Sequence, residues 1–250
     1  MNAKITKTNH TYKWKDFRGF SILFDNGQSH YDDNLLSNHF EKSPDFYRTL
    51  FTVFENYSRK NKVLADDGKF MKLTFGSWHV TVWDGINHGN FHQLKKEDAF
   101  YFSRFINTLK YRDIHPDIRA LIEKSIRWMN TTGEIRFKFR KLYNYENQVL
   151  VVSLKPADLD SLEKLHKIKL IRRNLNDYFE DNFGFATGKR YLPHSSLGYF
   201  VDEKYGEEFQ KYQNGLNDIL AKSLAGKTLD FNKTGLFSFS DMVSFYKTGG

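Results

Sequence analysis

Two short stretches of this chain repeat the same arrangement of polar residues inside an otherwise apolar strand pattern. The first is W-H-V-T-V-W, from Trp78 to Trp83, and the second is P-H-S-S-L-G-Y-F, from Pro193 to Phe200. Because alternate residues of a β-strand point to the same side of a sheet, each stretch predicts a strand with an imidazole and a hydroxyl on one face. Any fold for this chain must therefore accommodate two such strands from distant parts of the sequence.

The remaining hydrophobic patterns set the order of strands and helices along the chain. Strand patterns cover residues 17–24, 69–84, 135–142, 148–154, 191–201 and 235–245, and helical patterns cover 43–57, 96–111, 115–130, 162–179 and 205–224. This order is not a regular βαβ series, which argues against a doubly wound parallel sheet. We therefore predict an α+β fold with mixed or antiparallel sheets and helices packed outside them. The two histidine strands suggest two similar lobes.

Composition and charge narrow the classes of protein to which the chain can belong. It has no cysteine, which excludes disulfides, thiolate metal sites and cysteine nucleophiles. The net charge of +8 favours an anionic partner through long-range attraction. No signal-peptide-like segment or apolar run of membrane-spanning length is present, so we expect a cytoplasmic protein without membrane association. Without a long linker or low-complexity segment, residues 1–250 are predicted to form one unit.

The paired imidazoles and hydroxyls match the needs of phosphoryl transfer. His79 shares a strand face with Thr81, and His194 shares one with Ser196. Hydrolysis of a phosphodiester needs a base for the attacking oxygen and an acid for the leaving oxygen, and two histidines supply both near neutral pH. The hydroxyls can donate hydrogen bonds to the non-bridging oxygens, which carry charge in the transition state. This scheme requires no metal or other cofactor, and it leaves open which histidine is the base.

A plain structural interpretation competes with the catalytic one. A single H-x-T on a strand is close to background in a chain with 9 histidines, and most such histidines are structural or exposed. Two such motifs, each inside an otherwise apolar strand, favour catalysis. His88 and His92 have a spacing that suits a metal on a helix, but the glycine and asparagine between them indicate a loop. We therefore predict no metal site there.

The two motifs resemble the paired H-x-[ST]-h signatures, where h is hydrophobic, of the two-histidine phosphoesterase superfamily, also called LigT-like or 2H phosphoesterases. The longer stretches H-V-T-V-W-D-G-I-N, P-H-S-S-L-G-Y-F and F-S-F-S-D-M-V-S-F resemble an uncharacterised branch of it. The resemblance implies a bilobal LigT-like fold with a central cleft between two antiparallel sheets. It also implies that His79 and His194 are the acid/base pair and that Thr81 and Ser196 bind phosphate oxygens. The wide separation of the motifs predicts a helical insertion at about 96–131.

Further candidates for substrate contact are Trp83, Gly198, Arg136, Lys138 and Arg140. Trp83 and Gly198 have the parity of the motif residues, so a base could stack on the indole and the glycine could leave room for substrate. The alternatives are core packing for Trp83 and an eased strand twist for Gly198. By the same parity, Tyr199 points to the opposite face. The three cations form a basic row on one strand, which is either a solvated face or a contact for phosphates.

These patterns predict a metal-independent phosphodiesterase that acts on a nucleotide or RNA-derived phosphoester, either a 2',3'-cyclic phosphate or a 2'-5' linkage. An alternative with the same four residues is an enzyme that degrades cyclic nucleotide or cyclic oligonucleotide signals. An alternative from another class is a non-catalytic RNA-binding module that keeps the basic surface without turnover. A pure binder would not need two titrating imidazoles, which favours an enzyme. No obligate protein partner is inferred.

Overall fold

The computed structural model describes residues 1–8, 11–25, 30–31, 44–185, 187–188 and 190–248 of the chain. The α-helices within this part are α2 (Asp45–Ser58), α3 (Lys96–Thr108), α4 (Pro116–Asn130), α5 (Leu159–Phe183) and α6 (Glu203–Ser223). The strands are β1 (Ile5–Thr8), β2 (Thr11–Trp14), β3 (Gly19–Asp25), β4 (His30–Tyr31), β5 (Phe70–Lys72), β6 (Thr81–Asn87), β7 (Ile135–Tyr145), β8 (Val149–Pro156), β9 (His194–Phe200), β10 (Leu229–Phe231), β11 (Lys233–Phe239) and β12 (Phe245–Lys247).

The strands form two large sheets and one hairpin. One sheet has the order β10-β7-β8-β9-β5, the other has the order β4-β12-β11-β3-β6, and β1 pairs with β2. Every pairing among the described strands is antiparallel. The prediction of an α+β fold with antiparallel sheets is therefore confirmed. We refer to the two large sheets as the β9 sheet and the β6 sheet, since each carries one histidine motif.

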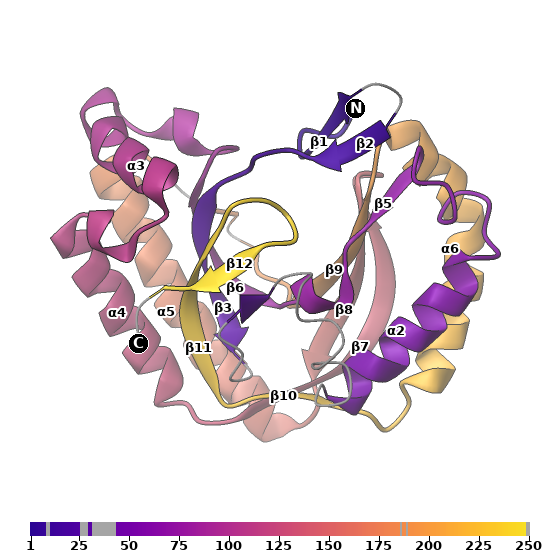
Figure 1. Ribbon diagram of the computed structural model, residues 1–250. Coiled ribbons are helices and arrows are strands. Elements are labelled where there is room, and N and C mark those ends of the chain that lie inside the picture. The colour runs from indigo at the N-terminus through magenta and orange to yellow at the C-terminus, as the bar shows by residue number, and fades with distance from the viewer. Residues whose placement is uncertain (9–10, 26–29, 32–43, 186, 189, 249–250) are drawn as a thin grey trace.

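The helices lie on two sides of the strands. Figure 1 shows α3, α4 and α5 on one side and α2 and α6 on the other. On the first side, the ring of Phe179 in α5 lies 5.0 Å from that of Trp83 in β6. On the second, Phe209 of α6 lies 5.7 Å from Phe200 of β9. Burying a large apolar side chain contributes roughly 1.5–3 kcal/mol, so these contacts help to hold α5 against β6 and α6 against β9.

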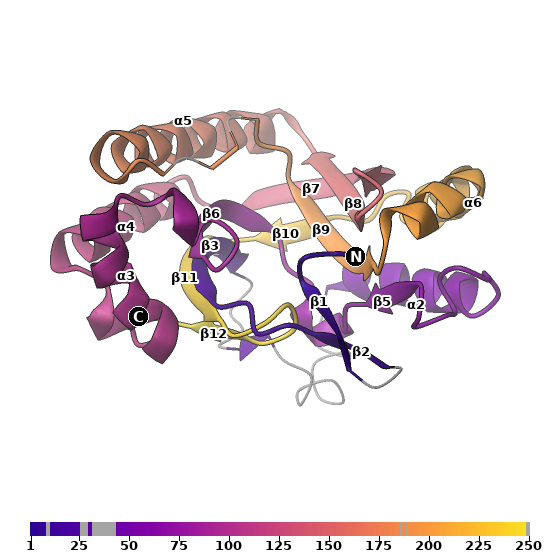
Figure 2. The same cartoon turned by 90° about the horizontal axis from the view of Figure 1, so that it is seen from above.

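The amino-terminal segment joins the two sheets. Figure 2, seen from above, shows the β1–β2 hairpin across the end of the strands. On one side the amide of Asn2 donates to the carbonyl oxygen of Val201, directly after β9, at 2.8 Å. On the other, the amide of Phe17 donates to the carbonyl oxygen of Ser240, directly after β11, at 2.9 Å. The sequence patterns did not predict this hairpin, whose short strands are mostly polar.

Two predicted strand ends are wrong for identifiable reasons. The strand pattern at 69–84 ends at Asp84, but β6 begins only at Thr81 and continues through Asp84 and Gly85 to Asn87. A Cβ at Gly85 would lie 2.3 Å from the carbonyl oxygen of Phe20, so the glycine permits close packing of strands and does not mark a turn. The strand predicted at 235–245 is two strands, because the carboxylate of Asp241 accepts two backbone N–H groups, both at 2.8 Å, and closes a turn.

Within the described residues, no helix combines the length and the apolar character that crossing a bilayer demands. The helices α3 and α4 fall in the segment 96–131. Their status as an insertion, the single-unit organisation and the cytoplasmic location stay predictions.

Candidate active site

The two histidines are anchored in the same way. The Nδ1 atom of His79 lies 2.7 Å from the carbonyl oxygen of Ser77, and the Nδ1 atom of His194 lies 2.9 Å from that of Leu192. A carbonyl oxygen only accepts hydrogen bonds, so each Nδ1 carries a proton and the lone pair of the neutral ring is on Nε2. In both motifs the acceptor is two residues before the histidine. The chain therefore fixes the same tautomer and the same ring anchor twice.

Both motif strands contain a β-bulge at the same place. In β6 the pairing with β3 skips Val82, the residue directly after Thr81. In β9 the pairing with β8 skips Leu197, the residue directly after Ser196. An extra residue reverses the side-chain alternation beyond it, and such bulges often lie beside active sites. Beyond Thr81 and Ser196, strict alternation of side chains therefore no longer predicts the correct strand face.

The prediction that Trp83 shares the face of His79 is wrong, because the bulge turns the indole to the opposite side of the sheet. The side chain of Trp83 has no exposed surface. Its Nε1 donates to the Oδ1 atom of Asn176 in α5 at 2.7 Å, which satisfies the buried indole. Trp83 therefore belongs to the core between β6 and α5, and no base can stack on it.

The residues after the bulge at Leu197 also lie on the strand faces opposite to those predicted. Gly198 is buried, and a Cβ there would lie 2.4 Å from the ring of Phe70 and 2.6 Å from the carbonyl oxygen of Met71. The glycine therefore makes room for β5, and the prediction that it leaves space for a substrate is wrong. Tyr199, predicted on the opposite face, shares the face of Ser196.

The hydroxyl residues of both motifs are half-buried, and in the second motif Ser196 lies on the strand face of His194. The pairing of β9 with β8 is regular from His194 to Ser196, so the two side chains share a face, and Ser196 is half-buried. Thr81 is half-buried as well, and its backbone oxygen accepts a hydrogen bond from the hydroxyl of Tyr191 at 2.9 Å. This last bond connects the first motif directly to the segment that leads into the second.

His79 lies in a half-buried environment that disfavours its charged form. Its ring centroid is 4.3 Å from that of Phe245. Burial lowers the pKa of His79 to about 4; the Ser77 carbonyl opposes this shift, and the positive charges of His194 and Lys4 add to it. The ring is therefore neutral at pH 7. The electrostatic influence of His194 on His79 also shows that the fold brings the two motifs near each other.

Lys4 belongs to neither motif, yet its positive charge acts on His79. Its Nζ donates to the hydroxyl of Tyr199 at 3.1 Å and lies 4.7 Å from the centroid of that ring. The hairpin strand β2 supports the same tyrosine, since Trp14 packs edge-on against it with ring centroids 5.7 Å apart. Only a tertiary contact between the amino-terminal hairpin and β9 places Lys4 here, so no local pattern marks it.

Arg172 of α5 joins the two motifs from within the core. Its guanidinium donates to the carbonyl oxygen of Val82 at 3.1 Å, to the hydroxyl of Thr187 at 3.0 Å and to the carbonyl oxygen of Gly188 at 2.8 Å. It also lies 5.2 Å from the ring centroid of Tyr191. Burial lowers the pKa of Arg172, but a guanidinium stays charged in proteins. The bulge of the first motif is thereby tied to the segment that enters the second.

The sequence contained a signal for Arg172. The buried apolar residues of α5 are Leu165, Ile168, Leu175 and Phe179. Arg172 continues this stripe at helical spacing and is itself buried. A charged side chain on a buried stripe needs buried partners, which makes it a candidate for positioning other groups.

The basic strand β7 keeps its predicted alternation only as far as Lys138. Its pairing with β8 skips Arg140, so this third bulge leaves Arg140 and Lys141 both exposed. Arg136 forms an ion pair of 2.8 Å with Asp158, the N-cap of α5. Lys138 donates to the backbone directly before that cap at 3.1 Å. These two cations hold the start of α5, and contact of the basic strand with substrate stays a prediction.

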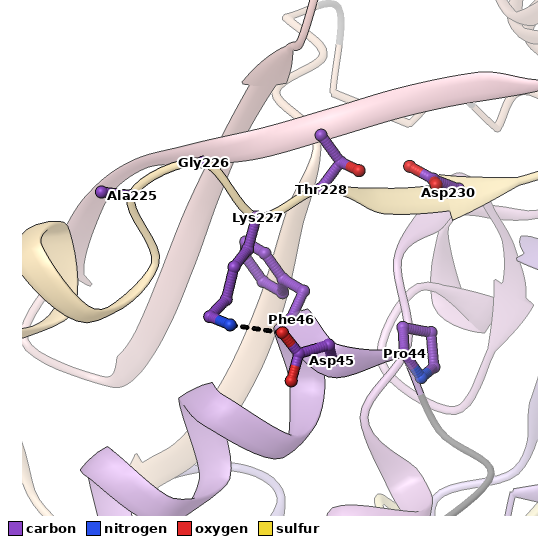
Figure 3. A pocket seen from close by; sticks show the side chains of 8 residues that line it. All are labelled: Pro44, Asp45, Phe46, Ala225, Gly226, Lys227, Thr228 and Asp230. Atoms are coloured by element: carbon purple, nitrogen blue, oxygen red, sulfur yellow. Dashed lines mark hydrogen bonds and ion pairs between the residues drawn. The ribbon is translucent and has the colours of Figure 1, made fainter.

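A separate pocket lies away from the histidines. Figure 3 shows it between the start of α2 and the segment that precedes β10, with an ion pair between Asp45 and Lys227. Its volume is about 580 Å³, and none of the predicted site residues lines it. Across the part of the chain that the structure describes, no group of three or more histidine, aspartate or glutamate side chains is placed to hold a metal ion.

Comparisons with known proteins place the fold. No family model matches the chain, and no curated protein matches its sequence. Among solved structures, a conserved protein of unknown function, ATU0111 from Agrobacterium tumefaciens, aligns with a TM-score of 0.54 and 12% identity. The alignment covers 94% of this chain and 86% of that one.

Two structures of Usb1 from Kluyveromyces marxianus, one of them with uridine monophosphate, align over 93% of this chain and 98% of theirs at 11% identity. Their TM-scores are 0.41 and 0.40, which do not establish a common fold. The chain therefore shares the fold of the Agrobacterium protein.

Proposed function

We propose that the protein is a metal-independent phosphodiesterase of the two-histidine phosphoesterase type. Its substrate is a nucleotide or RNA-derived phosphoester, either a 2',3'-cyclic phosphate or a 2'-5' linkage, bound in a cleft between the two sheets. The observation that carries the proposal is the matched anchoring of His79 and His194, in which each Nδ1 donates to the carbonyl oxygen two residues before it. With each Nδ1 held by a carbonyl oxygen, the Nε2 of one ring is left to accept a proton and the Nε2 of the other to give one.

In this proposal His79 is the base and His194 is the acid. His79 is neutral at pH 7 because its pKa is lowered to about 4, so its Nε2 accepts the proton from the attacking water. His194 is exposed at the start of β9 and, in its protonated form, gives its proton to the departing ribose oxygen. The new bond joins the water oxygen to phosphorus, and the bond from phosphorus to the ribose oxygen breaks. Proton exchange with solvent then restores both rings.

The motif hydroxyls and Lys4 favour the binding of the substrate phosphate. Thr81 and Ser196 donate hydrogen bonds to the non-bridging oxygens, whose negative charge grows in the transition state. Lys4 adds a positive charge close enough to His79 to influence its titration. A bound phosphate would offset that charge and raise the pKa of His79 toward the range in which a base works best.

A panel of substrates tests the proposal. We expect protein treated with EDTA to hydrolyse at least one of three classes: cyclic mononucleotides, 2'-5' dinucleotides, and RNA with a 2',3'-cyclic phosphate end. Product formation is followed by chromatography before and after the treatment. Turnover that disappears with EDTA and returns with a divalent metal would refute the metal-independent scheme. RNA binding without any product across the panel would favour the binding module.

The pH dependence tests which histidine is the base. The base must be neutral to act, so kcat/KM should rise as pH rises through the pKa of His79, with the acid limb near pH 4, and it should fall again at high pH because the general acid must carry its proton. Lys4→Met removes a positive charge that lowers this pKa, so the acid limb should move to higher pH. The matched control is Lys7→Met on the same hairpin, an exposed lysine that should leave the profile unchanged. An acid limb unaffected by Lys4→Met would contradict the assignment.

A further inference from the structure

The register of the β9 sheet places a set of lysines and tyrosines beside the second motif. Lys141 is opposite Ser153 of β8, which is opposite His194, so the three form one row across the sheet. In the next row, Tyr143 is aligned with Ser196 through the strand between them. Neighbouring strands are roughly 4.8 Å apart, so Lys141 and Tyr143 start only about 10 Å from the motif residues on the same face.

The same face continues in both directions along the strands. Lys138 and Lys155 are opposite each other at one end, and Tyr145 is opposite Val149 at the other. Lys155 and Val149 are six residues apart on β8, which is roughly 20 Å of strand at 3.4 Å per residue. We call the set Lys138, Lys141, Tyr143, Tyr145 and Lys155 the lysine–tyrosine face. It is too long for a single nucleotide.

The aromatic rings of this face are open to solvent. Tyr143 is 40% exposed and Tyr145 is 50% exposed, and their ring centroids are 6.1 Å apart. The Nζ atom of Lys141 lies 4.9 Å from the ring centroid of Tyr143, so a cation and a flat ring are presented together. Val151, between this face and Ser196, is buried. Exposed rings on a sheet are a surface on which unpaired bases stack.

The charge on this face is not neutralised. Within the described part of the chain, Lys141 and Lys155 of this face have no carboxylate at ion-pair distance, and neither has Arg140, which precedes Lys141 at the bulge. All three are exposed. Phosphates attract such cations by releasing counterions, and this attraction extends along a strand of nucleic acid. Charge and stacking together fit a polymer of alternating phosphates and bases.

We propose that the lysine–tyrosine face binds single-stranded RNA that continues from the phosphate at the histidines. This inference rests on the proposed function, because it takes the phosphate at the histidines to be the end of the bound RNA chain. Lysines on β7 and β8 hold backbone phosphates, and Tyr143 and Tyr145 stack on unpaired bases. Free mononucleotides would occupy the histidine site alone.

Equilibrium binding tests this face independently of turnover. The probe is a fluorescein-labelled single-stranded RNA of about 12 nucleotides, within the range that single-strand binding folds cover, and the readout is fluorescence anisotropy. The double variant Lys141→Gln/Tyr143→Ala should weaken binding roughly tenfold, because it removes one phosphate contact and one stacking ring. The slope of log affinity against log salt should become shallower by about 0.7.

The matched control removes the same two groups elsewhere. On α4 the Nζ atom of Lys124 lies 4.6 Å from the ring centroid of Trp128, which is 50% exposed. Lys124→Gln/Trp128→Ala should leave RNA affinity unchanged. Hydrolysis of a cyclic mononucleotide by the β7 double variant should also match wild type.

Four outcomes would overturn the inference. They are absence of RNA binding by the wild-type protein, equal affinity of wild type and the β7 double variant, an equal loss in the α4 control, and displacement of the RNA by poly-glutamate as effectively as by unlabelled RNA. The last would mean that the face responds to charge alone. If the mononucleotide is hydrolysed while RNA is not bound, the proposed function stands and this inference fails. If RNA is bound through the face but nothing is hydrolysed, this inference stands and the proposed function fails.

Discussion

Replacing either His79 or His194 by glutamine is expected to lower kcat roughly 10²–10⁴-fold for the phosphodiester that the protein hydrolyses. Glutamine removes the group that accepts or gives a proton and keeps a polar side chain of similar size. Because the two imidazoles act in one step, the double variant should lose little more than the worse single variant. Single-turnover rates at saturating substrate measure the effect separately from product release.

The matched control for these variants is His166→Gln, the same chemical change at an exposed position on α5. It should leave kcat unchanged. Wild-type rates in either motif variant would show that the corresponding histidine is not part of the chemistry. A loss in the control equal to that in the motif variants would point to a general effect of glutamine on the protein.

Arg172→Met is expected to have the largest effect on stability. It leaves the buried carbonyl oxygen of Val82 and the buried hydroxyl of Thr187 without their donor, and it also removes the donor to the carbonyl oxygen of the exposed Gly188. Each unsatisfied buried group costs about 1–3 kcal/mol, so the free energy of unfolding should fall by about 3 kcal/mol or more. Urea unfolding with an unchanged slope measures this loss.

The same variant should affect catalysis, because Arg172 ties the first bulge to the segment before His194. Under conditions in which the variant is folded, kcat should fall and KM should change little. The matched control is Arg173→Met, one residue further along the same helix and exposed, which should change neither stability nor kcat. If Arg172→Met is folded and has the kcat of wild type, Arg172 does not position the motifs.

Local patterns were sufficient for most of the fold. Helices such as α2 and α6 follow from apolar spacing, because burying one face of a helix is a local property of the sequence. The order of elements favoured an α+β arrangement, and the antiparallel pairing agrees with it. The β1–β2 hairpin was missed, since four-residue strands with little apolar alternation carry too weak a signal.

The residues after Thr81 and Ser196 show where side-chain alternation stops predicting the strand face. Trp83 and Gly198 were assigned to the site by parity, and a bulge directly after each hydroxyl places both on the other face. A bulge adds one residue to one strand of a pair, so it depends on the partner strand and is invisible in either strand alone. The same reasoning applies to Arg140 in β7.

The site itself could be predicted only as far as its motifs. His79 and His194 stand in recognisable local patterns, and the structure gives them a common anchor. Lys4 and Arg172 reach the same region through contacts between elements far apart in the sequence. Of these two, only Arg172 left a local trace, as a charged residue on a buried helical stripe.

Imidazole NMR during titration with inorganic phosphate tests the central claim most directly, because it observes both rings without requiring a known substrate. We expect the ring signals of His79 and His194 to shift together, with one dissociation constant, and the pKa of His79 to rise from about 4 as the anion stabilises its charged form. A response confined to one ring, or two responses with clearly different dissociation constants, would show that the histidines do not share a phosphate.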